Sequence, residues 1–246
     1  MFILSIETTG PHCSAALMDE KENIIIEKSL DRLNHLKVLT PLIDKLMKDN
    51  NVTKDQICAV AASRGPGSFT GIRIGVSTAR ALSQVWKKPC VAVPTLYAFG
   101  YSRKDEMLAD ENLAVCPIFD ARRNQIYGNC MAQRDGEIVE VVKAGPYMLD
   151  EYLSMVTDAC LEKGRCTLRF IGDGVEKYRD QIQQWAKEKG VSVDLLEVYQ
   201  YADSVAEIAK IMYDKGETLD FNSFEPEYMR KAEAQRKLEE RLLGSK

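Results

Sequence analysis

The start of the chain contains three short stretches rich in apolar residues, at 2–7, 13–19 and 23–30, separated by turn residues. Short runs of this kind, bounded by turn residues, predict β-strands, and three in succession predict an antiparallel meander. Helical periods and short apolar runs then predict a helix at about 35–49, a strand at 57–63, a helix at about 68–86 and a strand at 90–93.

The second half repeats this order of patterns. Strands are predicted at 113–119, 125–132, 137–143, 168–172 and 191–197, and helices at about 148–160, 175–189 and 203–215. The halves align at an offset of roughly 110 residues, which sets Glu7 opposite Asp120 and the loop at 63–68 opposite the one at 170–175. We therefore expect an α/β protein with a duplicated βββαβαβα unit, folded as two lobes that face each other across a cleft.

A polar, charged stretch at 101–112 separates the two repeats. It divides the chain into an N-terminal lobe (1–104), a C-terminal lobe (105–222) and a charged tail (223–246). The tail alternates in charge sign, with apolar leucines at Leu238, Leu242 and Leu243. This pattern favours a solvated helix or flexible arm, with a segment that docks on a partner as the alternative.

Composition limits the class of protein. Of the 246 residues 45% are hydrophobic and 28% charged, and the net charge of −4 lacks the basic footprint of a nucleic-acid-binding protein. Seven cysteines, none in a CxxC pair, favour free thiols in a reducing compartment. The N-terminus has no basic region typical of a signal peptide, and no segment approaches the length of a membrane span, so a cytoplasmic location is expected.

The densest motif is the glycine-rich loop GPGSFTGIRIG, which leads into the helix at 68–86. It is not a Walker A loop, because Ile72 follows Gly71 where lysine is required, and Thr70 and Phe69 exclude the dinucleotide fingerprint and the nucleophile elbow. What remains is a turn into a helix N-terminus, capped by Ser68 or Thr70 and only weakly indicative of an anion.

Small residues recur every fourth position along this helix, which indicates close approach by another backbone. They are Gly67, Gly71, Gly75, Ala79 and Ser83. The helices at 35–49 and 68–86 are also apolar on more than one face, which leaves two alternatives, a subunit interface or a thick core. The candidate interface residues are Leu36, Leu39, Ile43, Leu46, Gly71, Ile72, Gly75, Val76, Ala79 and Leu82.

Polar side chains gather where the predicted strands end. The stretch SIETTG pairs a carboxylate and two hydroxyls with a glycine turn between two predicted strands, and either a nucleotide contact or local hydrogen bonding in a hairpin explains them equally well. The candidate contacts with a nucleotide or phosphate are Glu7, Thr8, Thr9, Gly65, Gly67, Ser68 and Asp120. No catalytic constellation and no metal site can be assembled from the residues.

Four stretches together resemble the TsaB (YeaZ) family: LSIETTG, NHLKVLTPLIDKL, GPGSFTGIRIGVSTARAL and PEYMR. The motif from Gly65 to Gly75 is highly specific, whereas the second half matches mainly in architecture. The resemblance implies a ribonuclease H-like fold of the acetate kinase/Hsp70/actin superfamily. It also implies a non-catalytic subunit of the bacterial machinery that makes N6-threonylcarbamoyladenosine at position 37 of tRNAs reading ANN codons.

The resemblance further implies the partners. Members of the family pair with a TsaD-type catalytic subunit through the first-half helices, form a homodimer through the same surface when alone, and are joined by a TsaE-type ATPase. Pro94, Thr95 and Tyr97 stand where the TsaD paralogue would require metal-binding histidines. No tightly bound cofactor is expected; ATP or ADP with Mg²⁺ is considered only at an interface shared by the complex, tRNA is contacted only indirectly, and no membrane is involved.

Two other classes of protein stay open. An ATPase or kinase would use the cleft between the lobes, lined by Glu7, Thr8, Asp120 and the paired glycine loops. A metallopeptidase is disfavoured because HExxH and paired histidines are missing. If the interface reading holds, a charged residue at Gly75 or Val76 is expected to abolish partner binding and leave the monomer folded.

Overall fold

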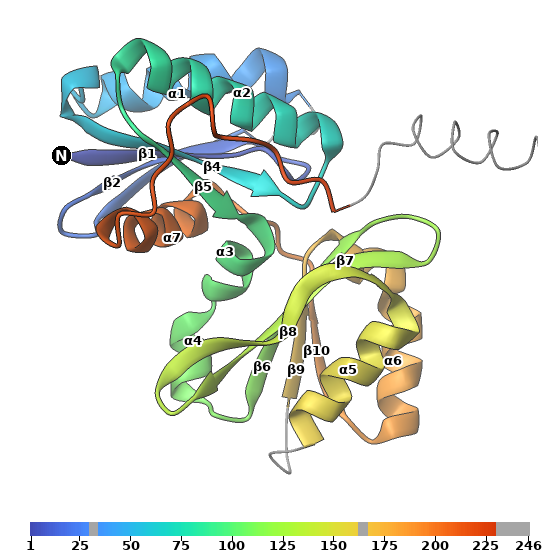
Figure 1. Ribbon diagram of the computed structural model, residues 1–246. Helices are drawn as coiled ribbons and strands as arrows, with labels where there is room; N and C mark the ends of the chain where they lie inside the picture. Colours follow the sequence, from blue (N-terminus) through green and yellow to red (C-terminus); the bar gives the residue numbers. More distant parts are fainter. Residues whose placement is uncertain (30–33, 162–166, 230–246) are drawn as a thin grey trace, which may run out of the picture.

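The computed structural model describes residues 1–29, 34–161 and 167–229, which form two mixed β-sheets (Figure 1). The first sheet has the strand order β3-β2-β1-β4-β5. Its strands are β1 (Phe2–Glu7), β2 (Ser14–Asp19), β3 (Ile24–Lys28), β4 (Ile57–Gly65) and β5 (Cys90–Pro94). The meander β1–β2–β3 is antiparallel, and β4 and β5 run parallel to β1, as the apolar strands without alternation require.

The second sheet repeats this topology. Its order is β10-β9-β6-β7-β8, which is the order of the first sheet read from the opposite edge. Its strands are β6 (Leu113–Asp120), β7 (Gln125–Arg134), β8 (Glu137–Met148), β9 (Thr167–Ile171) and β10 (Ser192–Leu196). Glu7 ends the central strand of one sheet and Asp120 ends the central strand of the other, so the duplicated α/β architecture is confirmed.

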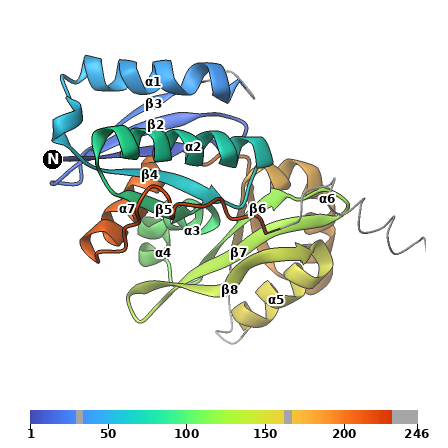
Figure 2. The same ribbon diagram turned by 45° about the horizontal axis from the view of Figure 1, so that its top comes forward.

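Two long helices cover one face of each sheet (Figures 1 and 2). On the first sheet they are α1 (His35–Asp49) and α2 (Phe69–Trp86), and on the second α5 (Leu149–Leu161) and α6 (Asp173–Lys189). Both helices of the first lobe lie where the apolar periodicity predicts them. Pro41 neither begins nor ends α1, since the helix starts at His35 and continues through it.

The opposite faces of the sheets are covered by an exchange of helices. Helix α7 (Ala202–Asp214) follows the last strand of the second lobe, yet Val205, Ile208 and Ala209 pack on the first sheet. Helix α3 (Thr95–Tyr101) follows the first lobe, and its Leu96 and Phe99 pack on the second sheet. The division of the chain at residue 104 assigned α7 to the C-terminal lobe. Apolar contact with β1 and β2 instead places this helix on the first lobe.

Three short helical elements lie outside the predicted helices and strands: α3, described above, and two others. The stretch 101–112 contains α4 (Lys104–Ala109), whose Met107 is fully buried in the cluster that joins α3 to the second sheet. A single 3₁₀ turn, η1 (Lys54–Gln56), precedes β4. The stretch 101–112 is rich in charged residues, yet burial of Met107 anchors a short helix in it.

The end of the described chain folds back on the first lobe as a segment we call the C-terminal strap, residues 219–229. Leu219 exchanges two backbone hydrogen bonds of 2.8 and 2.9 Å with Cys90 on the edge strand β5. Phe224 is fully buried in the core of the first lobe. The expectation of a solvated arm from residue 223 is therefore wrong for residues 223–229, because Phe224 anchors them; Leu238, Leu242 and Leu243 lie outside the described residues.

Candidate functional site

Helix α2 begins directly after the glycine-rich loop. The hydroxyl of Ser68 accepts a hydrogen bond of 3.3 Å from the Gly71 amide, and the Ser68 carbonyl accepts one of 2.8 Å from Ile72. Ser68 is therefore the N-cap, and Thr70 lies inside the helix. The loop thus ends in a helix terminus with one of its free amides already satisfied by a side chain.

The carboxylate of Glu7 is wholly buried and binds side chains of its own lobe. One oxygen accepts hydrogen bonds from the amide and, at 2.6 Å, the hydroxyl of Thr9, and the other accepts from the Ser63 hydroxyl. Burial raises the pKa of Glu7, and the hydrogen bonds from Ser63 and Thr9 only partly oppose this. A carboxylate satisfied in this way behaves as a structural group of the β1–β2 turn.

The β1–β2 turn packs directly on the glycine-rich loop. The Ser68 amide donates to the carbonyl of Thr9 at 2.8 Å, and the Thr8 hydroxyl donates to the carbonyl of Gly71 at 2.8 Å. From the far side, the Gln200 amide donates to the Thr9 hydroxyl at 3.0 Å. Five of the seven candidate nucleotide contacts therefore meet at this junction: Glu7, Thr8, Thr9, Gly67 and Ser68.

Each glycine of the motif faces a backbone or side chain of this same protein. A Cβ at Gly71 would lie 1.9 Å from the Thr8 carbonyl oxygen, and one at Gly75 would lie 2.4 Å from the Thr8 hydroxyl. A Cβ at Gly67 would meet Thr9 at 2.5 Å. The small-residue stripe does report close approach, but the approaching element is the β1–β2 turn and not a partner helix.

The C-terminal strap packs so closely on Gly65 that this position has no room for a side chain. The φ of +126° at Gly65 disfavours other residues, and a Cβ there would lie 2.3 Å from the carbonyl oxygen of Glu227. The Glu227 amide donates to the Arg64 carbonyl at 2.7 Å, and the two side chains form an ion pair of 2.8 Å. The position that a phosphate would need at this glycine is therefore lined by the strap backbone.

Asp120 does not join this junction. Its carboxylate accepts from Lys177 at 2.7 Å, from the Arg122 amide at 2.8 Å and from Tyr178 at 3.0 Å, all within the second lobe. Partial burial acts to raise its pKa, but these hydrogen bonds outweigh burial and lower it. Glu7 and Asp120 are equivalent by topology and bind separate sets of partners.

Most candidate interface residues lie in the core of the first lobe. The buried set consists of Leu39, Ile43, Leu46, Gly71, Ile72, Gly75, Val76 and Ala79. These side chains contact the sheet because the main apolar stripe of each helix faces it. A thick core therefore explains them, and a charged residue at Gly75 or Val76 would disrupt the monomer itself, contrary to the expectation from sequence.

A smaller set of apolar side chains on α1 and α2 stays partly or largely exposed, although Ile74 and Leu82 also pack against the core; we call this set the outer apolar face. Leu36 of α1 is 78% exposed and Val85 of α2 is 74% exposed. Leu82 and Ile74 are partly exposed, and Ala81 is exposed. Ile74, Ala81, Leu82 and Val85 recur at helical spacing, so they share one side of α2. Val85 is not among the interface residues predicted from the sequence, because periodicity alone does not show that it is exposed.

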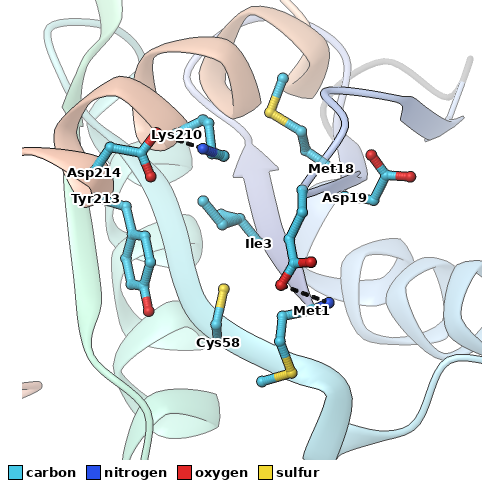
Figure 3. A pocket seen from close by; sticks show the side chains of 9 residues that line it. Met1, Ile3, Met18, Asp19, Cys58, Lys210, Tyr213 and Asp214 are labelled. Carbon is cyan, nitrogen blue, oxygen red and sulfur yellow. Dashed lines mark hydrogen bonds and ion pairs between the residues drawn. The ribbon is translucent and has the colours of Figure 1, made fainter.

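A pocket of about 280 Å³ opens at the other end of β1, away from Glu7 (Figure 3). Ile3, Met18 and Cys58 line it, with Lys210 and Tyr213 of α7. Its charged groups are paired, since Lys210 binds Asp214 and the Met1 ammonium lies 3.3 Å from Glu20. None of the residues selected from the sequence lines this pocket.

Residues 1–29, 34–161 and 167–229 contain neither a candidate metal site nor a candidate membrane-spanning helix. No three side chains of the types His, Cys, Asp and Glu are arranged to hold a metal ion. No helix in these ranges combines the length and the apolar character that crossing a membrane requires.

Two lobes of identical strand order, each with its polar turn at the end of the central strand, define a duplicated, two-lobed α/β protein. The family model that matches residues 29–238 is described as TsaD, tRNA N6-adenosine threonylcarbamoyltransferase. The chain therefore belongs to this family, and the relatives that match it over nearly its full length are TsaB (YeaZ) proteins.

Relatives match the chain over nearly its whole length. The tRNA threonylcarbamoyladenosine biosynthesis protein TsaB of Bacillus subtilis is 29% identical over 96% of this chain and 97% of its own. TsaB of Escherichia coli is 28% identical over 97% and 98%, respectively. A solved structure from Pseudomonas aeruginosa, described as similar to the peptidase YeaZ, shares the fold with a TM-score of 0.74 at 20% identity, covering 93% of this chain and 99% of that one.

Proposed function

We propose that this chain acts in tRNA threonylcarbamoyladenosine biosynthesis as a non-catalytic scaffold that binds and activates a TsaD-type transferase. The full-length similarity to TsaB proteins gives the pathway. The observation that carries the scaffold role is the outer apolar face: Leu36 is mostly exposed in the first turn of α1, and Val85 is mostly exposed in the last turn of α2. Large apolar side chains that stay exposed along a helical surface are typical of protein–protein interfaces.

The polar groups of the first lobe also support a role without catalysis. The carboxylate of Glu7 accepts hydrogen bonds from the hydroxyls of Thr9 and Ser63. The Thr8 hydroxyl donates to the carbonyl of Gly71. A general base or a phosphate ligand needs a lone pair or a donor directed at the substrate. At this junction those atoms are directed at the protein's own backbone and side chains, which supports packing as their role.

The same helices would serve the other partners. A homodimer of the free chain would use the outer apolar face, so that the TsaD-type subunit competes with it. A TsaE-type ATPase would join the assembled pair, and ATP or ADP with Mg²⁺ would bind at an interface shared by the complex. In this arrangement the transferase and the ATPase make most contacts with tRNA, in keeping with the net charge of −4 on this chain.

Reconstitution tests the proposal. The TsaD-type and TsaE-type proteins are incubated with tRNA, a threonylcarbamoyl donor and ATP, with and without this chain, and modified adenosine is quantified. We expect modification only when the chain is present and none from the chain alone. Turnover of ATP by the isolated chain, measured together with tight ATP binding in a calorimeter, would instead establish the ATPase or kinase alternative.

The matched variants are Leu36→Asp and Val85→Asp, with Lys48→Glu at the exposed end of α1 as the charge control. Each aspartate should abolish the complex and the modification while the thermal unfolding midpoint stays close to that of the wild type. Full modification by both aspartate variants would show that this face is not the interface.

A further inference from the structure

The C-terminal strap and the first turn of α2 bring together three exposed side chains that neither element supplies alone. Phe69 and Arg73 come from α2, and Tyr228 comes from the strap, 155 residues later than Arg73. The ring centroids of Phe69 and Tyr228 lie 4.7 Å apart, and the guanidinium of Arg73 lies 4.0 Å from the centre of the Phe69 ring. The Arg73 Nε donates a hydrogen bond of 2.9 Å to the Tyr228 hydroxyl.

This cluster is held in place and yet remains accessible. Phe224 is buried in the core four residues before Tyr228, and Glu227 binds Arg64 through both its amide and its carboxylate. Phe69 and Tyr228 nevertheless expose 37% and 38% of their surface. Aromatic residues and arginine, immobilised before binding, are the side chains that dominate protein interfaces, because little conformational entropy is lost when a partner arrives.

The charge of Arg73 is not neutralised within the described chain. Its contacts in residues 1–29, 34–161 and 167–229 are with the Tyr228 hydroxyl and the two aromatic rings, and no carboxylate is among them. Neighbouring Arg64, by contrast, is paired with Glu227. A planar guanidinium stacked on a ring keeps its remaining N–H donors free for a carboxylate from outside.

We propose that Phe69, Arg73 and Tyr228 form a docking site for an acidic side chain of the TsaD-type partner, continuous with the outer apolar face along α2. This inference rests on the proposed function and adds the chemistry of the contact: the partner presents an aspartate or glutamate to Arg73 and an apolar group to the two rings. The strap is therefore part of the interface, and the docking site is built only when residues 224–228 are seated on the first lobe.

Binding of the full-length chain to its TsaD-type subunit, measured by calorimetry, tests this site. Arg73→Glu and Tyr228→Ala should each weaken binding by at least about tenfold, and Arg73→Lys, which keeps the charge but not the planar fork, should weaken it less. The matched control is Glu225→Ala, an exposed strap residue that should bind as the wild type does. Wild-type affinity should fall as salt is raised, and that dependence should be weaker in Arg73→Gln.

The outcomes separate the two proposals. If the wild type binds and both Arg73→Glu and Tyr228→Ala bind equally well, the docking site is wrong while the scaffold role stands. Equal weakening by Glu225→Ala would also overturn it, because the effect would then belong to the strap in general. If the wild type does not bind the TsaD-type subunit at all, the scaffold role fails and this inference fails with it.

Discussion

The hydroxyl of Thr8 donates a hydrogen bond of 2.8 Å to the carbonyl of Gly71, which ties the β1–β2 turn to the first turn of α2. Thr8 also fills the space beside Gly71 and Gly75, so three residues that look like parts of a ligand loop form one packing contact. The two glycines face different parts of Thr8. A Cβ at Gly71 would clash with the Thr8 backbone, and a Cβ at Gly75 would clash with the Thr8 side chain.

Gly71→Ala and Gly75→Ala should both destabilise the protein, by about 1–3 kcal/mol each, because added volume in a close contact forces the chain apart. Their dependence on Thr8 should differ. At Gly75 the clash is with the Thr8 hydroxyl, and the Thr8 Cβ is at an ordinary 3.7 Å, so Gly75→Ala should become nearly neutral in a Thr8→Ala background. At Gly71 the clash is with the Thr8 carbonyl, and Thr8→Ala should give no relief.

Urea unfolding of the single and double variants provides the two double-mutant cycles. Ser77→Ala, at an exposed position of α2, is the control for helix propensity and should change stability by only a few tenths of a kcal/mol. Equal coupling in both cycles would contradict the assignment of the two contacts.

Glu7 should make the stability of the protein depend on pH. Burial raises the folded pKa of Glu7 above the ordinary value of a glutamate, so the folded state retains a proton that the unfolded chain releases. The stability that the protonated group contributes is complete below the ordinary glutamate pKa and is lost as the pH rises from there through the folded pKa. Glu7→Gln, which cannot ionise, should therefore gain stability relative to the wild type across this window.

Thermal unfolding from pH 4 upward measures the difference between Glu7→Gln and the wild type. Exposed Glu217→Gln serves as the control and should run parallel to the wild type. A constant difference between Glu7→Gln and the wild type at every pH would show that the Glu7 pKa is not raised.

Removal of the Phe224 side chain, which anchors the strap, should lower the free energy of unfolding far more than removal of the residues after Met229. Phe224→Ala should destabilise the first lobe by about 3–5 kcal/mol, the usual cost of deleting a fully buried phenylalanine. A chain that stops after Met229 retains the anchor and the Tyr228 contact, so its unfolding midpoint should match that of the full chain. Asn222→Ala, exposed in the same strap, is the matched control, and a loss from Met229 truncation as large as that from Phe224→Ala would refute the anchor.

Charge at Val85 and at Val76 should have opposite consequences. Val85 is 74% exposed and Val76 is 2% exposed, although the two lie on one helix and both are valines. Val85→Asp should leave the monomer folded and remove partner binding, whereas Val76→Asp should unfold the monomer because an unpaired carboxylate would enter the core. Circular dichroism and size-exclusion chromatography with the TsaD-type subunit distinguish the two results.

Local periodicity was sufficient for the long elements and for the duplication. The predicted strands and helices lie within five residues of the observed elements, whereas α3 and α4 were not predicted, and Glu7 and Asp120 are equivalent as the repeat indicated. The assignment of Ser68 or Thr70 as N-cap was resolved in favour of Ser68 by one hydrogen bond. These features depend on neighbours within one turn or one strand, which is the range over which a sequence pattern carries information.

What the pattern could not supply is the identity of contacts that are distant in sequence. The glycines at 71 and 75 indicated close approach, but nothing in the helix itself names Thr8 as the residue that approaches. Phe224 looked like one residue in a charged tail, and its burial depends on a chain that returns to the first lobe from α7. The roles of the outer apolar face and of bound nucleotide stay predictions.

The exchange of α3 and α7 has a consequence for how the protein is made. The first sheet is finished at Pro94, yet the face beneath β1 and β2 stays uncovered until α7 ends at Asp214. A ribosome adding about 5–20 residues per second leaves that apolar face bare for several seconds or more. The half of the protein that is synthesised first is therefore the last to close, and chaperones have their main opportunity to bind between these two events.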